Sequence, residues 1–159
     1  MLKSQTAIIF VEGIPGSGKS TFAQRLAFHL QRCGCRARWH HENDLNNPAN
    51  PAGTPHGWDA SDLRGRLSSW KQFVAQAIQD REIVILESSL FQRQLNRFVK
   101  ERKEDDLPDF MGALFKILRQ AFPILIQFSQ TSIRAHYEWL ASIRSDAIPH
   151  FSSIVRSSA

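Results

Sequence analysis

The chain has 159 residues, of which 42% are hydrophobic and 22% are charged. This composition is ordinary for a globular domain and excludes a disordered or fibrous protein. The excess of 20 Lys and Arg over 15 Asp and Glu gives a net charge of +5, which suits anionic ligands and admits nucleic acid. No apolar stretch is long enough to span a bilayer, and no cleavage signal follows the first one. We therefore expect one cytoplasmic domain over residues 1–159, without a membrane partner.

The first predicted elements are a strand, a glycine-rich loop and a helix, in that order. Residues 6–11 (TAIIFV) form a short apolar run, and residues 22–30 carry apolar side chains at helical spacing. Between them, residues 13–20 (GIPGSGKS) match the complete pattern G-x-x-x-x-G-K-[ST]. The match and its context predict a phosphate-binding loop.

Each residue type in this loop has a chemical reason. Glycines let the backbone approach phosphate oxygens closely, so that successive N–H groups point inward. Lys19 would place its ammonium against the β- and γ-phosphates, and the Ser20 hydroxyl would bind the Mg²⁺ that bridges them. The predicted cofactors are therefore ATP and Mg²⁺. The predicted nucleotide-binding residues are Gly13, Pro15, Gly16, Ser17, Gly18, Lys19, Ser20 and Thr21.

Strands and helices continue to alternate after the loop. The patterns predict, in chain order, a strand over 36–40, a loop over 46–57, a helix over 58–80 with a break near Gly65, a strand over 82–86, a helix over 90–99, a charged break over 100–109 closed by Pro108, a helix over 110–122, a strand over 123–128 and a helix over 131–144. This alternation predicts an α/β fold, the three-layer αβα architecture of P-loop NTPases, with a parallel sheet of about four to five strands. Gly13, Glu42 and Glu87 then fall at the carboxyl edge of the sheet, where ligands bind.

The run Val11 to Thr21 resembles the opening of the nucleoside and nucleotide kinases, particularly the thymidylate kinase and deoxyribonucleoside kinase branches. Glu42 resembles their acid at the tip of the second strand, and Glu87 resembles the acid that ends their third strand. Residues 89–92 (SLFQ) are similar to their substrate-pocket segment, and residues 42–48 to an acid-rich tip followed by Pro in bacterial P-loop kinases. The resemblance implies an ATP- and Mg²⁺-dependent phosphotransferase that acts on a small acceptor, such as a nucleoside or a nucleotide.

Two departures from those kinases bear on the chemistry. The deoxyribonucleoside branch has Arg after the third-strand acid, where this chain has Ser88. Those kinases also continue past an arginine-bearing lid to a fifth strand, whereas only residues 145–159 follow the last predicted helix here. We therefore expect the domain to be short at its C-terminus.

The remaining site assignments concern the metal and the acceptor. Glu87 is predicted to bind Mg²⁺ together with Ser20, because an acid at the end of the neighbouring strand can reach the metal's shell. Glu42 is predicted to orient or deprotonate the acceptor hydroxyl, the alternative being a solvated loop acid. The predicted catalytic residues are Lys19, Glu42 and the lid arginine Arg144, and the predicted substrate-binding residues are Glu42, Asp44, Gln92 and Arg93.

Two other functions stay open on the sequence, and a third is disfavoured. One is a nucleotide-binding protein or ATPase with little kinase activity, which Ser88 favours. Another is a nucleic-acid-acting P-loop ATPase, although no RNA-binding signature or basic cluster with interleaved aromatics supports a nucleic-acid partner. A GTPase is disfavoured, because the D-x-x-G match at 62–65 does not follow a strand and no N-K-x-D follows it. A homodimer is compatible with all of these.

Overall fold

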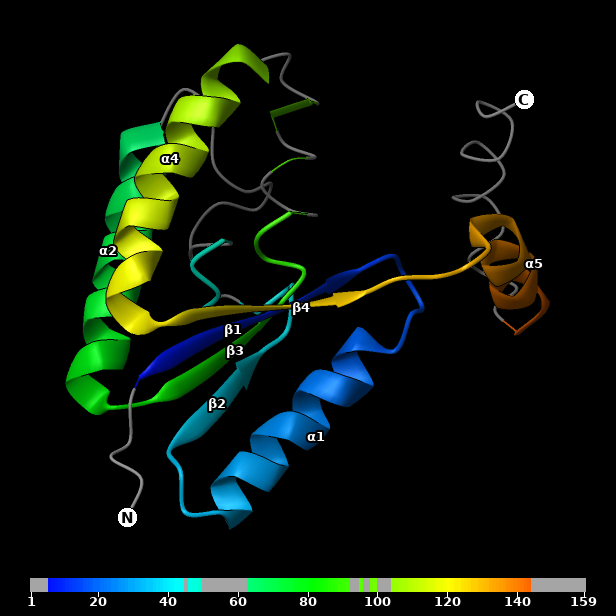
Figure 1. The fold of residues 1–159 in the computed structure, drawn as a ribbon, viewed down its shortest axis with the longest axis horizontal. Helices are drawn as coiled ribbons and strands as arrows, with labels where there is room; N and C mark the ends of the chain where they lie inside the picture. Colours follow the sequence, from blue (N-terminus) through cyan, green and yellow to red (C-terminus); the bar gives the residue numbers. More distant parts are fainter. Residues whose placement is uncertain are drawn as a thin grey trace.

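The computed structural model describes residues 6–44, 46–49, 63–91, 95, 98–99 and 104–143. These residues form an α/β fold around a four-stranded parallel sheet with the strand order β2-β3-β1-β4 (Figure 1). The strands are β1 (Ala7–Gly13), β2 (Ala37–His40), β3 (Ile83–Glu87) and β4 (Pro123–Phe128). The predicted fold class is confirmed, and all four predicted strands are present.

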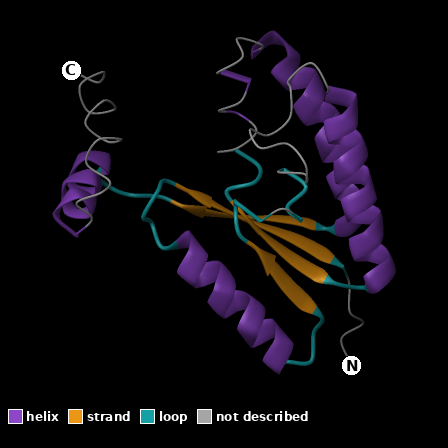
Figure 2. Cartoon of the chain, turned by 180° about the vertical axis from the view of Figure 1, so that it is seen from behind, coloured by secondary structure: helices purple, strands orange, loops and turns teal. Residues whose placement is uncertain are grey.

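Helices cover both faces of the sheet (Figure 2). They are α1 (Lys19–Arg32), α2 (Leu63–Asp80), α4 (Leu107–Leu118) and α5 (Ile133–Ile143), with short 3₁₀ turns at Glu104–Asp106 and Arg119–Ala121. Helix α1 lies on one face, α2 and α4 lie side by side on the other, and α5 lies apart from both layers (Figure 1). None of these described helices is long and apolar enough to cross a membrane.

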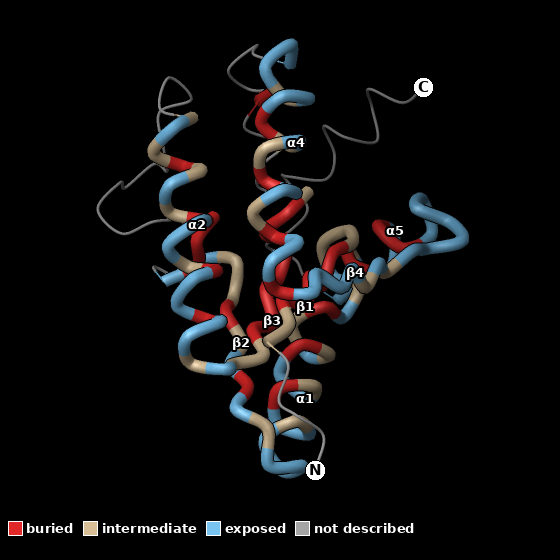
Figure 3. The backbone as a smooth tube through the Cα atoms, turned by 60° about the vertical axis from the view of Figure 1, so that its left-hand side comes forward, coloured by how far each residue is buried: buried red, intermediate tan, exposed pale blue. Residues whose placement is uncertain are grey.

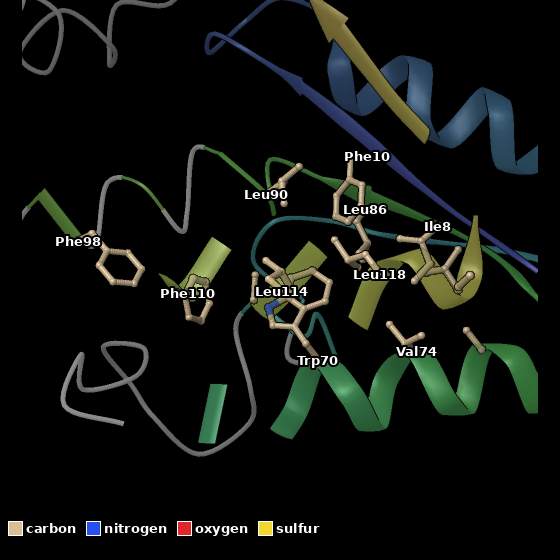
Figure 4. Packing of buried hydrophobic residues seen from close by; sticks show 14 residues of the cluster. Ile8, Phe10, Trp70, Val74, Leu86, Leu90, Phe98, Phe110, Leu114 and Leu118 are labelled. Carbon is tan, nitrogen blue, oxygen red and sulfur yellow. The ribbon is translucent and has the colours of Figure 1, made fainter. Parts of the chain in front are cut away.

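The core has two parts because alternate side chains of a strand point to opposite faces of the sheet. In β1, Ile8 and Phe10 pack with α2 and α4, around the fully buried Trp70 (Figure 4). Ile9 and Val11 face the other way and pack against α1. Buried residues therefore run from Ile8 to Glu12 in β1 and from Val84 to Glu87 in β3 (Figure 3), as the continuous apolar runs predict.

The strand order places the end of β1 between the ends of β3 and β4. Val11 is in register with Glu87 on one side, and Gly13 with Phe128 on the other. Gly13 has φ +149°, and a Cβ there would lie 2.8 Å from both the Cβ and the carbonyl oxygen of Phe128. Only glycine therefore fits where the chain leaves β1 and enters the loop.

Three details of the predicted helices are wrong. Helix α2 runs through Gly65 without a break, because the buried Arg66 and Trp70 anchor it and the cost of a helical glycine is only about 1 kcal/mol. The charged break ends earlier than expected, since α4 begins at Leu107 with Pro108 in its first turn, where the missing N–H costs nothing.

The third error concerns the segment after β3. Leu90 and Phe91 lie in a turn, whereas Leu95, Phe98 and Val99 are helical as predicted, so the predicted start of this helix is wrong. The predicted loop over 46–57 and helix start over 58–62 lie largely outside the described residues, as does much of the predicted helix over 90–99.

Candidate functional site

A pocket of about 460 Å³ opens at the carboxyl edge of the sheet. One wall is formed by the loop between β1 and α1 together with the first residues of α1, and the other by the segment after β2. We call these the phosphate wall (Pro15, Gly16, Gly18, Lys19, Ser20 and Thr21) and the loop wall (His41 and Glu42), with Glu87 between them. Six of the eight predicted nucleotide-binding residues line this pocket. Gly13 and Ser17 do not line it, but belong to the same loop.

Lys19 is held inside the phosphate wall. Its Nζ donates a hydrogen bond to the Ile14 carbonyl oxygen at 2.9 Å, and only 5% of the residue is exposed. Burial lowers the pKa of Lys19 from its usual 10.5, against the charges of Glu87, Glu42 and Glu12, which raise it. The loop therefore contains a cation with little access to water, which an anionic ligand would stabilise.

The two predicted metal ligands meet. The Ser20 hydroxyl donates to Glu87 Oε1 at 2.6 Å, although 67 positions separate the two residues. Glu87 is 3% exposed, and its Oε2 is buried without a hydrogen-bond partner among the described residues. A hydroxyl and an unsatisfied carboxylate oxygen are the hard donors that Mg²⁺ prefers. The described residues contain no cluster of three His, Cys, Asp or Glu side chains that could hold a metal, so phosphate or water would have to supply the other ligands.

The loop wall is held in place by Asn47, which sequence analysis missed. Asn47 is fully buried, and its Nδ2 donates to the His41 carbonyl oxygen at 3.2 Å and to Ser89 Oγ at 2.7 Å. Its Oδ1 accepts from the Ala49 N–H at 2.9 Å. A single side chain thus ties the segment that carries Glu42 to the end of β3. No local pattern could have revealed this, because Asn in a Pro-rich stretch is an ordinary loop residue.

Asp44 engages its own segment instead of the pocket. Its Oδ2 lies 2.9 Å from His40 Nδ1, and its Oδ1 accepts from the Asn46 N–H at 2.9 Å. Partial burial would raise the pKa of Asp44, but these two hydrogen bonds and the charge of Arg38 outweigh it and lower that pKa. The structure therefore places Asp44 as a brace of the turn after β2, outside the pocket lining that contains Glu42.

A second buried carboxylate, Glu12, supports the segment after β3. Glu12 is 1% exposed, and its Oε1 accepts from the Leu90 N–H at 2.7 Å. Ser88, between Glu87 and Leu90, is fully buried and has a left-handed backbone conformation with φ 51°. Its N–H donates a hydrogen bond to the Val11 carbonyl oxygen at 3.0 Å. Non-glycine residues rarely adopt this conformation, which concentrates at functional sites. Two hydrogen bonds to residues of β1, Val11 and Glu12, therefore hold the turn that directly follows Glu87.

Three of the predicted site residues cannot be placed relative to the pocket. Gln92, Arg93 and Arg144 lie outside the described residues. Arg134, on α5, is exposed and pairs with Glu138, with 3.1 Å between Nε and Oε1. No arginine of the described part of the chain lines the pocket.

Comparison with protein families matches residues 6–103, more than half of the chain, to the family described as chromatin associated protein KTI12. The chain belongs to the KTI12 family. The KTI12 match includes the phosphate wall, the loop wall and Glu87, whereas β4 and α5 lie beyond it. The complete phosphate-binding loop and the sheet topology give this member of the family a P-loop nucleotide-binding fold. The narrower likeness to nucleoside and nucleotide kinases stays a resemblance.

Two solved structures resemble the fold. The hexameric APS kinase from Thiobacillus denitrificans matches with 12% identity and a TM-score of 0.46, over 79% of this chain but only 22% of that one. The thymidylate kinase from Ehrlichia chaffeensis matches with 16% identity and a TM-score of 0.36, over 87% of this chain and 98% of that one. No curated protein matches the chain. Neither structural likeness bears on the activity of this KTI12 family member.

Proposed function

We propose that the protein is an ATP- and Mg²⁺-dependent phosphotransferase that acts on a hydroxyl group of a small acceptor. The observation that carries this proposal is the convergence of four side chains on one pocket. Lys19 and Ser20 come from the phosphate-binding loop, Glu87 from the end of β3 and Glu42 from the segment after β2. Phosphoryl transfer requires charge neutralisation and alignment more than covalent catalysis, and these side chains supply both.

The phosphate wall would bind the donor nucleotide. The Lys19 ammonium now donates to a carbonyl oxygen of its own loop, and phosphate oxygens would be stronger partners for it because they are charged. Ser20 and Glu87 would hold Mg²⁺, since they are hard oxygen donors within hydrogen-bond distance of each other and one carboxylate oxygen is unsatisfied. When bound, this ion neutralises negative charge on the phosphates.

The loop wall would position the acceptor. A hydroxyl oxygen forms the new bond to the γ-phosphorus, the bond from that phosphorus to the bridging oxygen of ADP breaks, and the hydroxyl proton passes to the Glu42 carboxylate. Glu42 is suited to this because it lines the same pocket as Lys19. The resemblance to nucleoside and nucleotide kinases makes these compounds the first acceptors to try.

A second candidate is a nucleotide-binding protein or ATPase with little transfer activity. It is favoured by one specific observation, the lack of arginine among the described residues that line the pocket. Arginine stabilises the charge of the transition state in many phosphoryl-transfer enzymes, and Ser88 stands where the deoxyribonucleoside kinases have it. Arg93 and Arg144 are the residues that would supply this charge in the kinase proposal.

The test is ADP release by the wild type and Lys19→Ala, with Mg²⁺, in the presence and absence of an acceptor panel. The panel contains nucleosides, nucleoside monophosphates, small hydroxylated metabolites and a single-stranded oligonucleotide. Acceptor-stimulated release that Lys19→Ala abolishes would support the kinase proposal and identify the acceptor class. Tight ATP binding without stimulation by any acceptor would overturn it in favour of the second candidate.

A further inference from the structure

Helix α5 is not a layer of the fold, yet three of its residues are buried. It lies beyond the carboxyl end of β4, beside the phosphate-binding loop and apart from the helices that cover the sheet (Figure 1). His136, Tyr137 and Leu140 are at most 9% exposed, whereas Ile133 and Trp139 are more than half exposed. The buried side of α5 therefore has a specific contact surface.

Part of that surface is the phosphate-binding loop itself. His136 Nε2 lies 2.9 Å from the Pro15 carbonyl oxygen, a contact between residues 121 positions apart. A carbonyl oxygen only accepts, so the ring nitrogen is the donor and His136 carries its proton on Nε2. One turn further along α5, Leu140 covers Gly16, where a Cβ would lie 2.4 Å from Leu140 Cδ2.

The direction of the His136 hydrogen bond determines the direction of a neighbouring N–H. The peptide bond between Pro15 and Gly16 is planar and trans, so its C=O and N–H point in opposite directions. The C=O points to His136, which does not line the pocket, while Pro15 and Gly16 do. The Gly16 N–H therefore points away from His136, and Gly16 itself lines the pocket.

We infer that His136 is a positioning residue for phosphate binding, which orients the Gly16 N–H toward a nucleotide phosphate while Leu140 fixes the same peptide by packing. This inference rests on the proposed function only in taking the ligand to be a nucleotide phosphate. Backbone N–H groups in such loops bind anions because they are preoriented. Gly16 has φ +74°, and glycine can adopt several other backbone conformations of similar energy. A contact from outside the loop is therefore needed to hold this peptide in one orientation. The residues of α5 lie outside the segment that matches the KTI12 family.

The first experiment needs no nucleotide. The ¹⁵N–¹H resonance and order parameter of Gly16 are measured in the wild type, His136→Ala and His136→Gln, with the exposed His29→Ala as matched control. We expect His136→Ala to shift the resonance and lower the order parameter, and His136→Gln, which keeps a side-chain donor, to restore much of both. An unchanged Gly16 resonance in His136→Ala would overturn the inference.

The second experiment measures the Kd of Mg²⁺-ADP for the same variants by calorimetry. Loss of one oriented donor should raise the Kd about fivefold in His136→Ala, and less in His136→Gln. If the wild type binds ADP and His136→Ala binds it equally well, the positioning role is wrong while the proposed function stands. If the wild type binds no nucleotide, the proposed function is wrong. The proposal that the Gly16 N–H binds a phosphate is then wrong too, even if His136→Ala shifts the Gly16 resonance.

Discussion

The two walls of the pocket are built in different ways. The phosphate wall is local in sequence, since six residues between Pro15 and Thr21 form it and its geometry follows from glycines and the start of α1. The loop wall has little regular structure, and side chains hold it in place: Asn47 ties it to β3, and Asp44 closes its turn onto His40. A sequence motif is thus enough to predict the phosphate wall, whereas the conformation of the loop wall depends on contacts between residues far apart in the sequence. Substitutions should therefore affect the two walls separately.

The largest effect should come from Lys19→Ala, which removes the only cation that the described pocket lining contains. We expect turnover to fall about 10³-fold, because a preoriented charge next to the transferred group is lost. Steady-state kinetics measure this, with Lys71→Ala on the exposed surface of α2 as control. Turnover within a few-fold of the wild type would place the chemistry elsewhere.

On the loop wall, Glu42→Gln should lower kcat about 10²-fold without weakening ATP binding, because the acceptor's proton acceptor is lost while Lys19 keeps its place and loses only a neighbouring negative charge. Calorimetry and initial rates separate the two quantities. The control is Asp105→Asn, which changes an exposed acid outside the pocket. If ATP affinity and kcat fell together, Glu42 would belong functionally to the phosphate wall and the separation of the walls would be wrong.

Asn47→Ala should weaken the loop wall without touching a ligand. It leaves Ser89 Oγ, the His41 carbonyl oxygen and the Ala49 N–H without their buried partner, so the free energy of unfolding should fall by about 1–3 kcal/mol. The KM for the acceptor should rise more than the KM for ATP. Asn46→Ala is the matched control, because the Asn46 contact to Asp44 uses the backbone N–H. Equal rises in both KM values would contradict a role confined to this wall.

The smallest effect should be on the pH dependence of the free energy of unfolding, through His40 at the end of β2, where the loop wall begins. Burial lowers the pKa of His40 from 6.5, against the hydrogen bond to Asp44, which raises it. The unfolded chain therefore takes up this proton more readily, so stability is fully present above pH 6.5 and is lost as pH falls toward the lower native pKa. Denaturant unfolding at pH 7.5 and 5.5 should show a smaller loss for His40→Gln than for the wild type. The exposed His29→Gln should behave as the wild type. An equal loss for His40→Gln and the wild type would rule this contribution out.

The sequence predicts the phosphate wall better than it predicts the loop wall. Lys19, Ser20 and Glu87 could be assigned because a motif fixes the loop and because the apolar run of β3 ends at an acid beside it. The meeting of Ser20 with Glu87 then follows from the parallel pairing of β1 and β3. Strands β1, β3 and β4 were predicted from strand-length apolar runs, whereas β2 was predicted from the glycine-containing turn before it and the acidic residues after it.

The contacts that sequence analysis missed join residues far apart in the chain. Asn47 reaches Ser89 across 42 positions, Glu12 reaches Leu90 across 78, and His136 reaches Pro15 across 121. Each residue type is common in loops or helices without such a role. Only the register of the sheet and the path of α5 bring these groups together, so no local pattern identifies them.

The central claim is that the pocket transfers a phosphoryl group, and the fate of the γ-phosphate of labelled ATP tests it most directly. The protein is incubated with Mg²⁺, γ-labelled ATP and the acceptor panel, and the label is followed by chromatography. We predict that it appears on one class of hydroxyl acceptor, that Glu42→Gln slows this transfer, and that Lys19→Ala abolishes it. Label that stays on ATP, or that appears only as inorganic phosphate with every acceptor, would contradict the account.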